Sequence, residues 1–311
     1  MTRETREAIK YIYRLIYEKN QFVFWFFIRI VSVLIPPLAV YLFSQIIRCL
    51  ETSCTPNRTY FLVFLTFVFY LLDNFLRLLS VHKIQYLIYK TESHIQKFFT
   101  QDLQLQDKKK RHQAVQTIRN FSDATRLTME VINQPGIDGF VSLFYLPTLV
   151  FFLDFRVFIL QIAYILVYFF TDEYTTGLYA KIKEDQNKKI ENYYGKLQSS
   201  NDISLESSQL LKQYHRLCAH GFWEWFSLQN TAVVFFSLVL IYLVYSVIVG
   251  NKQISDVFLL TSYLVSTQVF LNSISLVKDR LADTKVAIFR LSKNKTTSVD
   301  FDDLTDFEHT R

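Results

Sequence analysis

The sequence predicts an all-α membrane protein with six transmembrane helices, on the basis of its apolar stretches, its few helix breakers and its charge distribution. The six apolar stretches cover residues 21–47, 60–82, 138–153, 157–171, 222–249 and 255–277. Most approach or exceed the roughly 20 residues that cross a hydrocarbon core about 30 Å thick. With only 6 Gly and 5 Pro in 311 residues, long helices are favoured over the short alternating strands of a β-barrel.

The basic residues predict the orientation of these helices. Of the 34 Lys and Arg residues, 28 lie in segments 1–20, 83–137, 172–221 and 275–311, whereas the alternate gaps hold only Arg48, Arg58, Arg156 and Lys252. Cytoplasmic loops are enriched in Lys and Arg, so both termini are expected in the cytoplasm, with the chain in the plasma (inner) membrane. The net charge of +6 then reflects topology, and we expect contact with lipid and none with nucleic acid.

Residues 1–20 precede the first span and are expected to form an amphipathic elbow helix on the cytoplasmic membrane surface. The pattern consists of apolar and basic side chains at helical spacing: Ile9, Lys10, Tyr13, Arg14, Leu15 and Ile16. A plain charged leader is the alternative. Pro36-Pro37 in the first span and Pro147 in the third each predict a kink or a local opening of the helix, and Pro135-Gly136 predicts a bend where the third span begins.

The first outer connection contains Cys49 and Cys54. An oxidising compartment would permit a disulfide between them, and two free thiols are an equally good interpretation. The other outer connections are short, at Asp154–Arg156 and Gly250–Ile254.

The two cytoplasmic connections, 83–134 and 172–220, contain few helix breakers and have apolar residues at helical spacing. They predict that spans two to five continue as helices into the cytoplasm and form two paired arms. About 20 additional residues would extend a helix by roughly 30 Å.

Each pair of arm helices must turn at a tip. The first predicted tip is the charged run Gln106–Gln113, and the second is Ser199–Glu206. In the second tip, Asp202 or Ser204 is expected to cap a short helix over Leu205–Leu211.

Polar residues inside the spans are costly and therefore suggest a role. Asp73 and Arg77 are four residues apart in the second span, which predicts an intramembrane ion pair on one helix face. Arg29 is expected either to pair with Asp73 from the first span or to extend to the cytoplasmic edge. Candidates for a substrate pathway are four amides, which could also join helices by hydrogen bonds: Gln229, Asn230, Gln268 and Asn272.

Two stretches resemble the transmembrane domain of ABC exporters, and most closely the type I secretion exporters. The first runs from Gln116 to Leu153, where the matching residues are Gln116, Arg119, Pro135-Gly136, Phe144 and Pro147, while Asn120 and Tyr145 replace the acidic residues usual in the family. The second runs from Gly250 to Leu291, with Ile254-Ser255-Asp256 at its start and Ala287, Arg290 and Leu291 at its end. Together with the six spans and two arms, the resemblance covers about 290 residues.

The resemblance implies a domain at 21–291 followed by a polar acidic tail at 292–311. Such a domain is a permease that works by alternating access as a homo- or heterodimer, with its arm tips against a separate nucleotide-binding subunit. The corresponding tip residues here are Gln106, Asp107, Lys108, Lys109, Lys110, Arg111, Asp202, Ser204, Leu205 and Glu206.

No G-x-x-x-x-G-K-[ST] motif occurs in the 311 residues, so we expect ATP to be bound and hydrolysed by the partner subunit. We expect no catalytic, cofactor or metal site in this chain. A membrane enzyme is disfavoured, because the six His residues form no H-E-x-x-H motif. The main alternative to transport is a scaffold or receptor that keeps the exporter fold without coupling to ATP.

Overall fold

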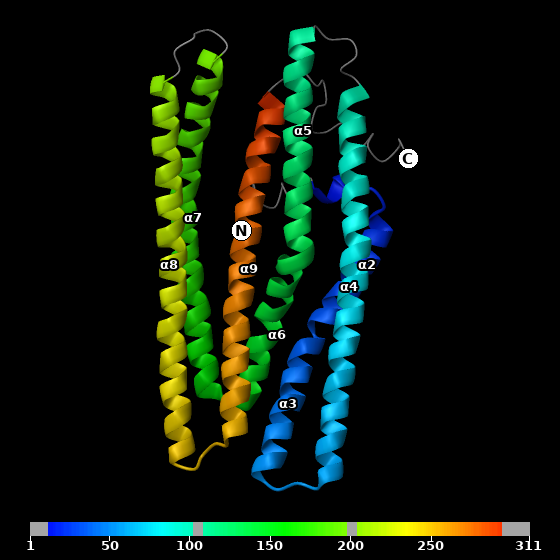
Figure 1. Cartoon of the computed structure of the whole chain (residues 1–311), viewed down its shortest axis with the longest axis vertical. Helices are drawn as coiled ribbons and strands as arrows, with labels where there is room; N and C mark the ends of the chain where they lie inside the picture. The colour runs from blue at the N-terminus through cyan, green and yellow to red at the C-terminus, as the bar shows by residue number, and fades with distance from the viewer. Residues whose placement is uncertain (1–11, 102–107, 198–203, 294–311) are drawn as a thin grey trace. The chain divides into compact units, whose positions relative to one another are not determined.

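The computed structural model describes residues 12–101, 108–197 and 204–293, and every regular element in these ranges is helical (Figure 1). The elements are α2 (Lys19–Val33), α3 (Ile35–Glu51), α4 (Pro56–Gln101), α5 (Lys108–Val131), the π-helix η2 (Ile132–Gly136), α6 (Ile137–Leu153), α7 (Phe155–Leu197), α8 (Ser204–Ile248) and α9 (Ile254–Lys293).

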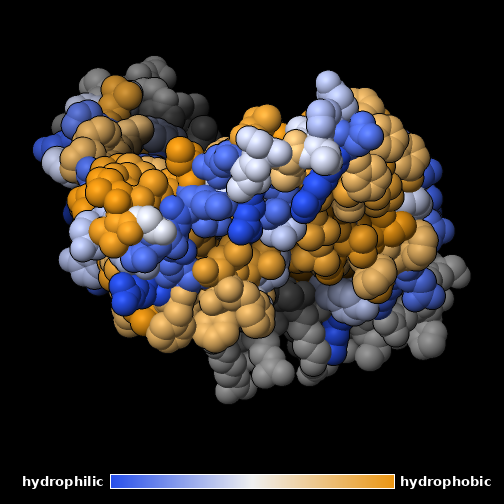
Figure 2. Space-filling model, turned by 90° about the horizontal axis from the view of Figure 1, so that it is seen from below, coloured by the Kyte–Doolittle hydropathy of each residue, from blue (hydrophilic) through white to orange (hydrophobic). Residues whose placement is uncertain are grey.

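Six helical segments are long and apolar enough to cross a membrane, and together they make this an integral multi-pass membrane protein. They are Lys19–Glu51, Pro56–Thr100, Thr117–Leu153, Phe155–Tyr179, Ser207–Ile248 and Ile254–Ile288. Each covers one of the six apolar stretches of the sequence to within one residue, so the predicted number and order of spans is confirmed. Side chains that face outward on these segments are largely apolar, as the orange areas in Figure 2 illustrate.

The chain packs as two compact units. The first combines residues 1–146 with residues 254–311, and the second is residues 147–253. In the first unit, α2 and α3 pack along α4, while α5 packs between α4 and α9. The second unit is a hairpin in which α7 and α8 lie side by side (Figure 1).

Four helices are much longer than a membrane is thick. α4, α7, α8 and α9 contain 46, 43, 45 and 40 residues. At 1.5 Å per residue they are about 60–69 Å long, roughly twice the thickness of a hydrocarbon core.

Two of the spans are interrupted where the sequence contains Pro. The first span breaks at Leu34, and α3 then begins with Pro36 in its first turn, where a missing N–H costs no hydrogen bond. The third span passes through η2, which contains Pro135. A widened π turn accommodates a residue that cannot donate to the helical ladder. By contrast, α6 continues through Pro147 without a break.

The N-terminal segment packs against protein where the structure describes it. Ile12, Leu15 and Ile16 are buried inside the first unit, where Leu15 packs with residues of α4 and α5. Lys90 Nζ on α4 lies 2.8 Å from Glu18 Oε1. In the described part of residues 1–20, most of the apolar face is therefore covered by protein. Ile9 and Lys10 lie outside the described residues.

The predicted tips are only partly within the described residues. The charged run was predicted to interrupt the helix, but residues 108–113 form the start of α5. Likewise, Leu205–Leu211 is not a separate short helix but the first part of α8. Helices tolerate Lys and Arg well, so a basic run alone does not end one.

Asp154 is the single residue between α6 and α7, and it organises that turn. Its Oδ1 accepts hydrogen bonds from the N–H groups of Arg156 and Val157, which caps α7. Its Oδ2 lies 2.8 Å from Lys252 Nζ and accepts a hydrogen bond from the Tyr242 hydroxyl. Although burial alone would raise the pKa of Asp154, the Lys252 ammonium and these donors hold that pKa below its ordinary value.

Candidate functional site

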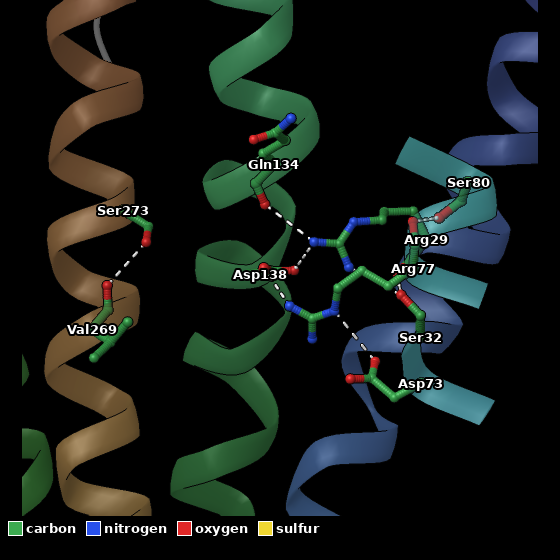
Figure 3. A network of polar contacts seen from close by, with 9 residues as sticks. All are labelled: Arg29, Ser32, Asp73, Arg77, Ser80, Gln134, Asp138, Val269 and Ser273. Carbon is green, nitrogen blue, oxygen red and sulfur yellow. Dashed lines mark hydrogen bonds and ion pairs between the residues drawn. The ribbon is translucent and has the colours of Figure 1, made fainter. Parts of the chain in front are cut away.

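Four charged side chains from three different spans meet inside the first unit (Figure 3). Arg29 comes from α2, Asp73 and Arg77 come from α4, and Asp138 comes from the first turn of α6. We call these four residues the charge cluster. Ionisable residues within membrane spans are expensive, so the cluster is the principal candidate for a functional site.

The charge cluster lies at a similar depth on each of its helices. Counting from Glu51, Pro56 and Leu153, which end the apolar spans at the predicted outer side, its members are 15 to 22 residues away. At 1.5 Å per residue this is about 23–33 Å. The hydrocarbon core is about 30 Å thick, so the cluster is close to the predicted cytoplasmic boundary.

Arg29 and Asp138 form the tightest pair of the cluster. Arg29 Nη2 lies 2.6 Å from Asp138 Oδ1, and the Arg29 side chain is only 2% exposed. Arg29 also donates through Nη1 to the Ser32 hydroxyl at 3.0 Å and through Nη2 to the Gln134 carbonyl at 3.2 Å. These contacts engage both terminal nitrogens of the buried guanidinium, whereas its Nε has no hydrogen-bond partner among the described residues.

Arg77 sits between two carboxylates and binds neither tightly. Its Nε lies 3.4 Å from Asp73 Oδ1, and its Nη1 lies 3.6 Å from Asp138 Oδ2. Its side chain is 35% exposed, far more than that of Arg29. Two arginines and two aspartates make the cluster formally neutral, and Arg77 is the member that can shorten one contact while lengthening the other.

The π-helix η2 supplies part of the cluster from the backbone. The Gln134 carbonyl that accepts from Arg29 belongs to η2, four residues before Asp138 (Figure 3). Backbone groups released from the regular i→i−4 ladder are available to other donors. Backbone irregularity and buried charge therefore occur together in the third span.

Close packing against α9 fixes the position of Asp138. A Cβ added at Gly139 would lie 2.8 Å from the Phe270 carbonyl oxygen, and one added at Gly136 would lie 2.8 Å from Val277 Cγ2. Neither contact leaves room for a side chain larger than hydrogen. Small residues allow such close approach between membrane helices. The two glycines thus pack against α9 on either side of Asp138, whose side chain is directed to α2 and α4.

Two further polar networks hold α5 to its neighbours near the polar end of the unit. Arg126 Nη1 lies 2.7 Å from Glu130 Oε1, and its Nε lies 3.2 Å from Glu92 Oε2 on α4. On the other side, the hydroxyl groups of Thr128 and Thr284 are 2.7 Å apart, which connects α5 to α9. Direct polar contacts therefore join α4, α5 and α9 beyond the charge cluster.

The structure gives the predicted intramembrane residues the following positions. Asp73 and Arg77 make the i,i+4 contact that their spacing predicts. Arg29, however, pairs with Asp138 rather than directly with Asp73, and its side chain is buried by protein.

The four candidate pathway amides are divided between the two compact units. Gln268 and Asn272 are half-buried on α9, in the first unit. Gln229 is half-buried and Asn230 is exposed on α8, in the second unit. The Asn230 side-chain amide donates to the Phe226 carbonyl one turn earlier in its own helix.

The predicted coupling residues fall at the margins of the described ranges. Gln106, Asp107 and Asp202 lie outside them. Lys108, Lys109, Lys110 and Arg111 form the first turn of α5, and Ser204, Leu205 and Glu206 form the first turn of α8.

Asp138 is the functional candidate that the sequence analysis did not single out. The sequence does contain a signal for it, because Asp138 is an acidic residue at the first position of the apolar stretch 138–153. In the described part of the chain, no three His, Cys, Asp or Glu residues are grouped so as to hold a metal ion.

Comparison with known proteins gives no family assignment: no family model matches the chain, and no curated protein matches it.

Proposed function

We propose that this chain is the transmembrane permease subunit of an ABC-type exporter, in which two such subunits move substrate by alternating access. The ATP that drives this motion is bound and hydrolysed by a nucleotide-binding unit outside these 311 residues. Both termini and the polar ends of the long helices face the cytoplasm. The resemblance of residues 116–153 and 250–291 to exporter sequences agrees with this function.

The observation that carries the proposal is the length of the helices. α4, α7 and α8 each continue for tens of residues beyond what a bilayer requires, and they do so on the side where Lys and Arg are concentrated. Rigid helices of this length can transmit motion from a cytoplasmic motor to the membrane interior, because helix pairs move as rigid bodies. A protein that only needed anchoring would gain nothing from such extensions.

The charge cluster supports a moving part at the cytoplasmic boundary. Arg77 contacts carboxylates on two spans at 3.4 and 3.6 Å, so a small shift of α4 against α6 would shorten one contact and lengthen the other, while Asp138 keeps Arg29 as its partner. In the proposed cycle, this shift lets the first unit adopt two arrangements of similar energy.

Purification from native membranes tests the proposal. The tagged chain, extracted in mild detergent, is expected to retain a protein containing a Walker A motif, identified by mass spectrometry. Reversing two tip charges with Lys108→Glu and Lys109→Glu should lower the amount retained. The matched control reverses two exposed charges at the predicted outer side, Arg58→Glu and Arg156→Glu, and should retain as much as wild type.

Two results would count against transport. One is equal retention of the ATPase by the tip and control variants. The other is stable retention of a partner without a Walker A motif when the tips are altered, which would favour the scaffold or receptor alternative. Topology is tested separately in a chain whose native cysteines Cys49, Cys54 and Cys218 are replaced by Ser. A cysteine introduced at Asn251 should react with an impermeant maleimide from outside intact cells, whereas one at Lys109 should react only after lysis.

A further inference from the structure

The end of α3 forms a helix C-cap that brings two cysteines together. The Thr52 N–H donates to the Arg48 carbonyl at 3.0 Å, and the Cys54 N–H donates to the Cys49 carbonyl at 2.9 Å. Between them, Ser53 has a φ of 53°, in the left-handed region. A hydrogen bond from the sixth residue back to the first, with a left-handed residue before its donor, defines a Schellman motif.

The Schellman motif pairs particular side chains. Its first and sixth residues commonly make a side-chain contact across the turn, and in this chain both positions are cysteines. Cys49 is buried at 4% exposure, whereas Cys54 is half-buried. The third cysteine, Cys218, is exposed on α8. The two thiols therefore differ in access to solvent while sharing one turn.

The surroundings of Cys54 favour its thiolate. A hydrogen bond from the Cys49 thiol, followed by one from the Thr52 hydroxyl, lowers the pKa of Cys54 below its ordinary value. Thr52 Oγ1 lies 3.5 Å from Cys54 Sγ. The thiolate is the nucleophile in thiol–disulfide exchange, so the more accessible of the two sulfurs is also the more reactive one.

We propose that Cys49 and Cys54 are a disulfide-forming pair, in which Cys54 attacks an external disulfide and Cys49 resolves the product. The inference rests on the geometry of the α3 cap and does not require the transport function. The residue between them in the left-handed region is Ser53, and residues other than Gly adopt this conformation uncommonly. A Cys49–Cys54 disulfide would therefore lock a turn that is otherwise strained.

The reaction is balanced with a low-molecular-mass disulfide, RSSR, as the oxidant. The Cys54 thiolate attacks one sulfur of RSSR, which forms the mixed disulfide Cys54–S–SR and releases RS⁻. Cys49 then loses its proton and attacks the Cys54 sulfur, which forms the Cys49–Cys54 disulfide and releases a second RS⁻. Two electrons pass to RSSR, and the two thiol protons go to solvent or to the two thiolates released.

Glutathione titration of the purified chain tests the proposal. The full chain carrying Cys218→Ser is equilibrated in detergent with mixtures of reduced and oxidised glutathione, quenched with acid, unfolded and alkylated, and weighed as an intact protein. We expect a single transition from two alkylated cysteines to none, with a product two hydrogen atoms lighter than the reduced chain. In denaturant the same transition should require a glutathione ratio at least about tenfold more oxidising.

Single substitutions in the same Cys218→Ser background test the order of attack. With Cys49→Ser, the glutathione adduct on Cys54 should accumulate, because nothing resolves it. With Cys54→Ser, the buried Cys49 should remain largely unmodified, and Cys49→Ala serves as a second variant should the serine disturb folding. The proposal is overturned if both thiols stay alkylatable at every ratio, if the parent chain accumulates the adduct, or if native and denatured chains have the same transition.

Discussion

Replacing Asp138 with Asn tests the charge cluster most directly. The substitution keeps the shape of the side chain and removes its charge. Arg29 then remains 2% exposed without its 2.6 Å partner, and only its contacts to Ser32 and Gln134 persist. We expect a large loss of stability, because the cost comes from a charge that is left buried rather than from a lost contact.

The expected magnitude follows from this burial. Removing one partner of a buried ion pair lowers the free energy of unfolding by about 3–5 kcal/mol. The remaining hydrogen bonds of Arg29 place this substitution near the lower end, at about 3 kcal/mol. Asp73→Asn is the matched comparison: it removes a 3.4 Å contact to Arg77, which is 35% exposed, and should cost about 1 kcal/mol or less.

A double-substitution cycle separates the pair from its members. Arg29→Met and Asp138→Leu should each destabilise the protein, while the two together should restore most of the loss, since the remaining pair of Asp73 and Arg77 is still neutral. The readout is the free energy of unfolding from denaturant titration in mixed micelles, with helicity measured by circular dichroism. Near-wild-type stability of Asp138→Asn, or additivity of the two single losses, would refute the reasoning.

Three further predictions concern other parts of the fold. Gly139→Ala should destabilise the protein by about 1–3 kcal/mol, because its Cβ would lie 2.8 Å from a carbonyl oxygen of α9. The control Gly177→Ala, whose Cβ would have nothing within 4 Å, should be neutral or stabilise the protein by up to about 1 kcal/mol. Thermal unfolding of the two variants provides the comparison. Leu15→Ala should cost about 2–5 kcal/mol because Leu15 is 0% exposed, and equal small effects of Leu15→Ala and the exposed-site control Tyr13→Ala would contradict burial of the N-terminal segment. Asp154 has a folded-state pKa below its unfolded value. Its contribution to the free energy of unfolding is therefore present above about pH 4 and is lost as pH falls through the folded pKa. Asp154→Asn should therefore be less stable than wild type by about 1 kcal/mol at pH 7, and unfolding measured against pH should show this gap closing in acid.

The membrane spans could be predicted from the sequence because their signal is local. A run such as 222–249 is apolar over most of its length, with Glu224 as its only charged residue, and no tertiary contact is needed to recognise it. The Pro pair at 36–37 marked the break in the first span for the same reason, since a missing N–H disturbs the helix wherever it packs. The basic run 108–111 forms the first turn of α5, because charge indicates exposure and says little about where a helix begins.

The partners within the charge cluster could not be predicted in this way. Arg29 had two acidic candidates, Asp73 and Asp138, at similar depth on different spans. The choice depends on η2, since one extra residue in a helical turn rotates everything after it by about 100°. Leu15 shows the same limit: its position in an apolar stripe predicts burial, while only tertiary packing decides whether protein or lipid covers it.

The position of the charges argues for a role beyond stability. A well-packed apolar replacement of a buried ion pair is often as stable as the pair itself, so stability alone does not require four charges here. Arg29 lies five residues before the break at Leu34, and Asp138 lies two residues after η2, so both occupy spans that are already irregular. In the proposed function, the irregular backbone and the loosely held pairing at Arg77 are the features that would allow two arrangements, as a moving helix requires. The stability-restored double variant of Arg29 and Asp138 should therefore fold and yet fail to exchange partners at Arg77, which separates the mechanical role of the cluster from its contribution to folding.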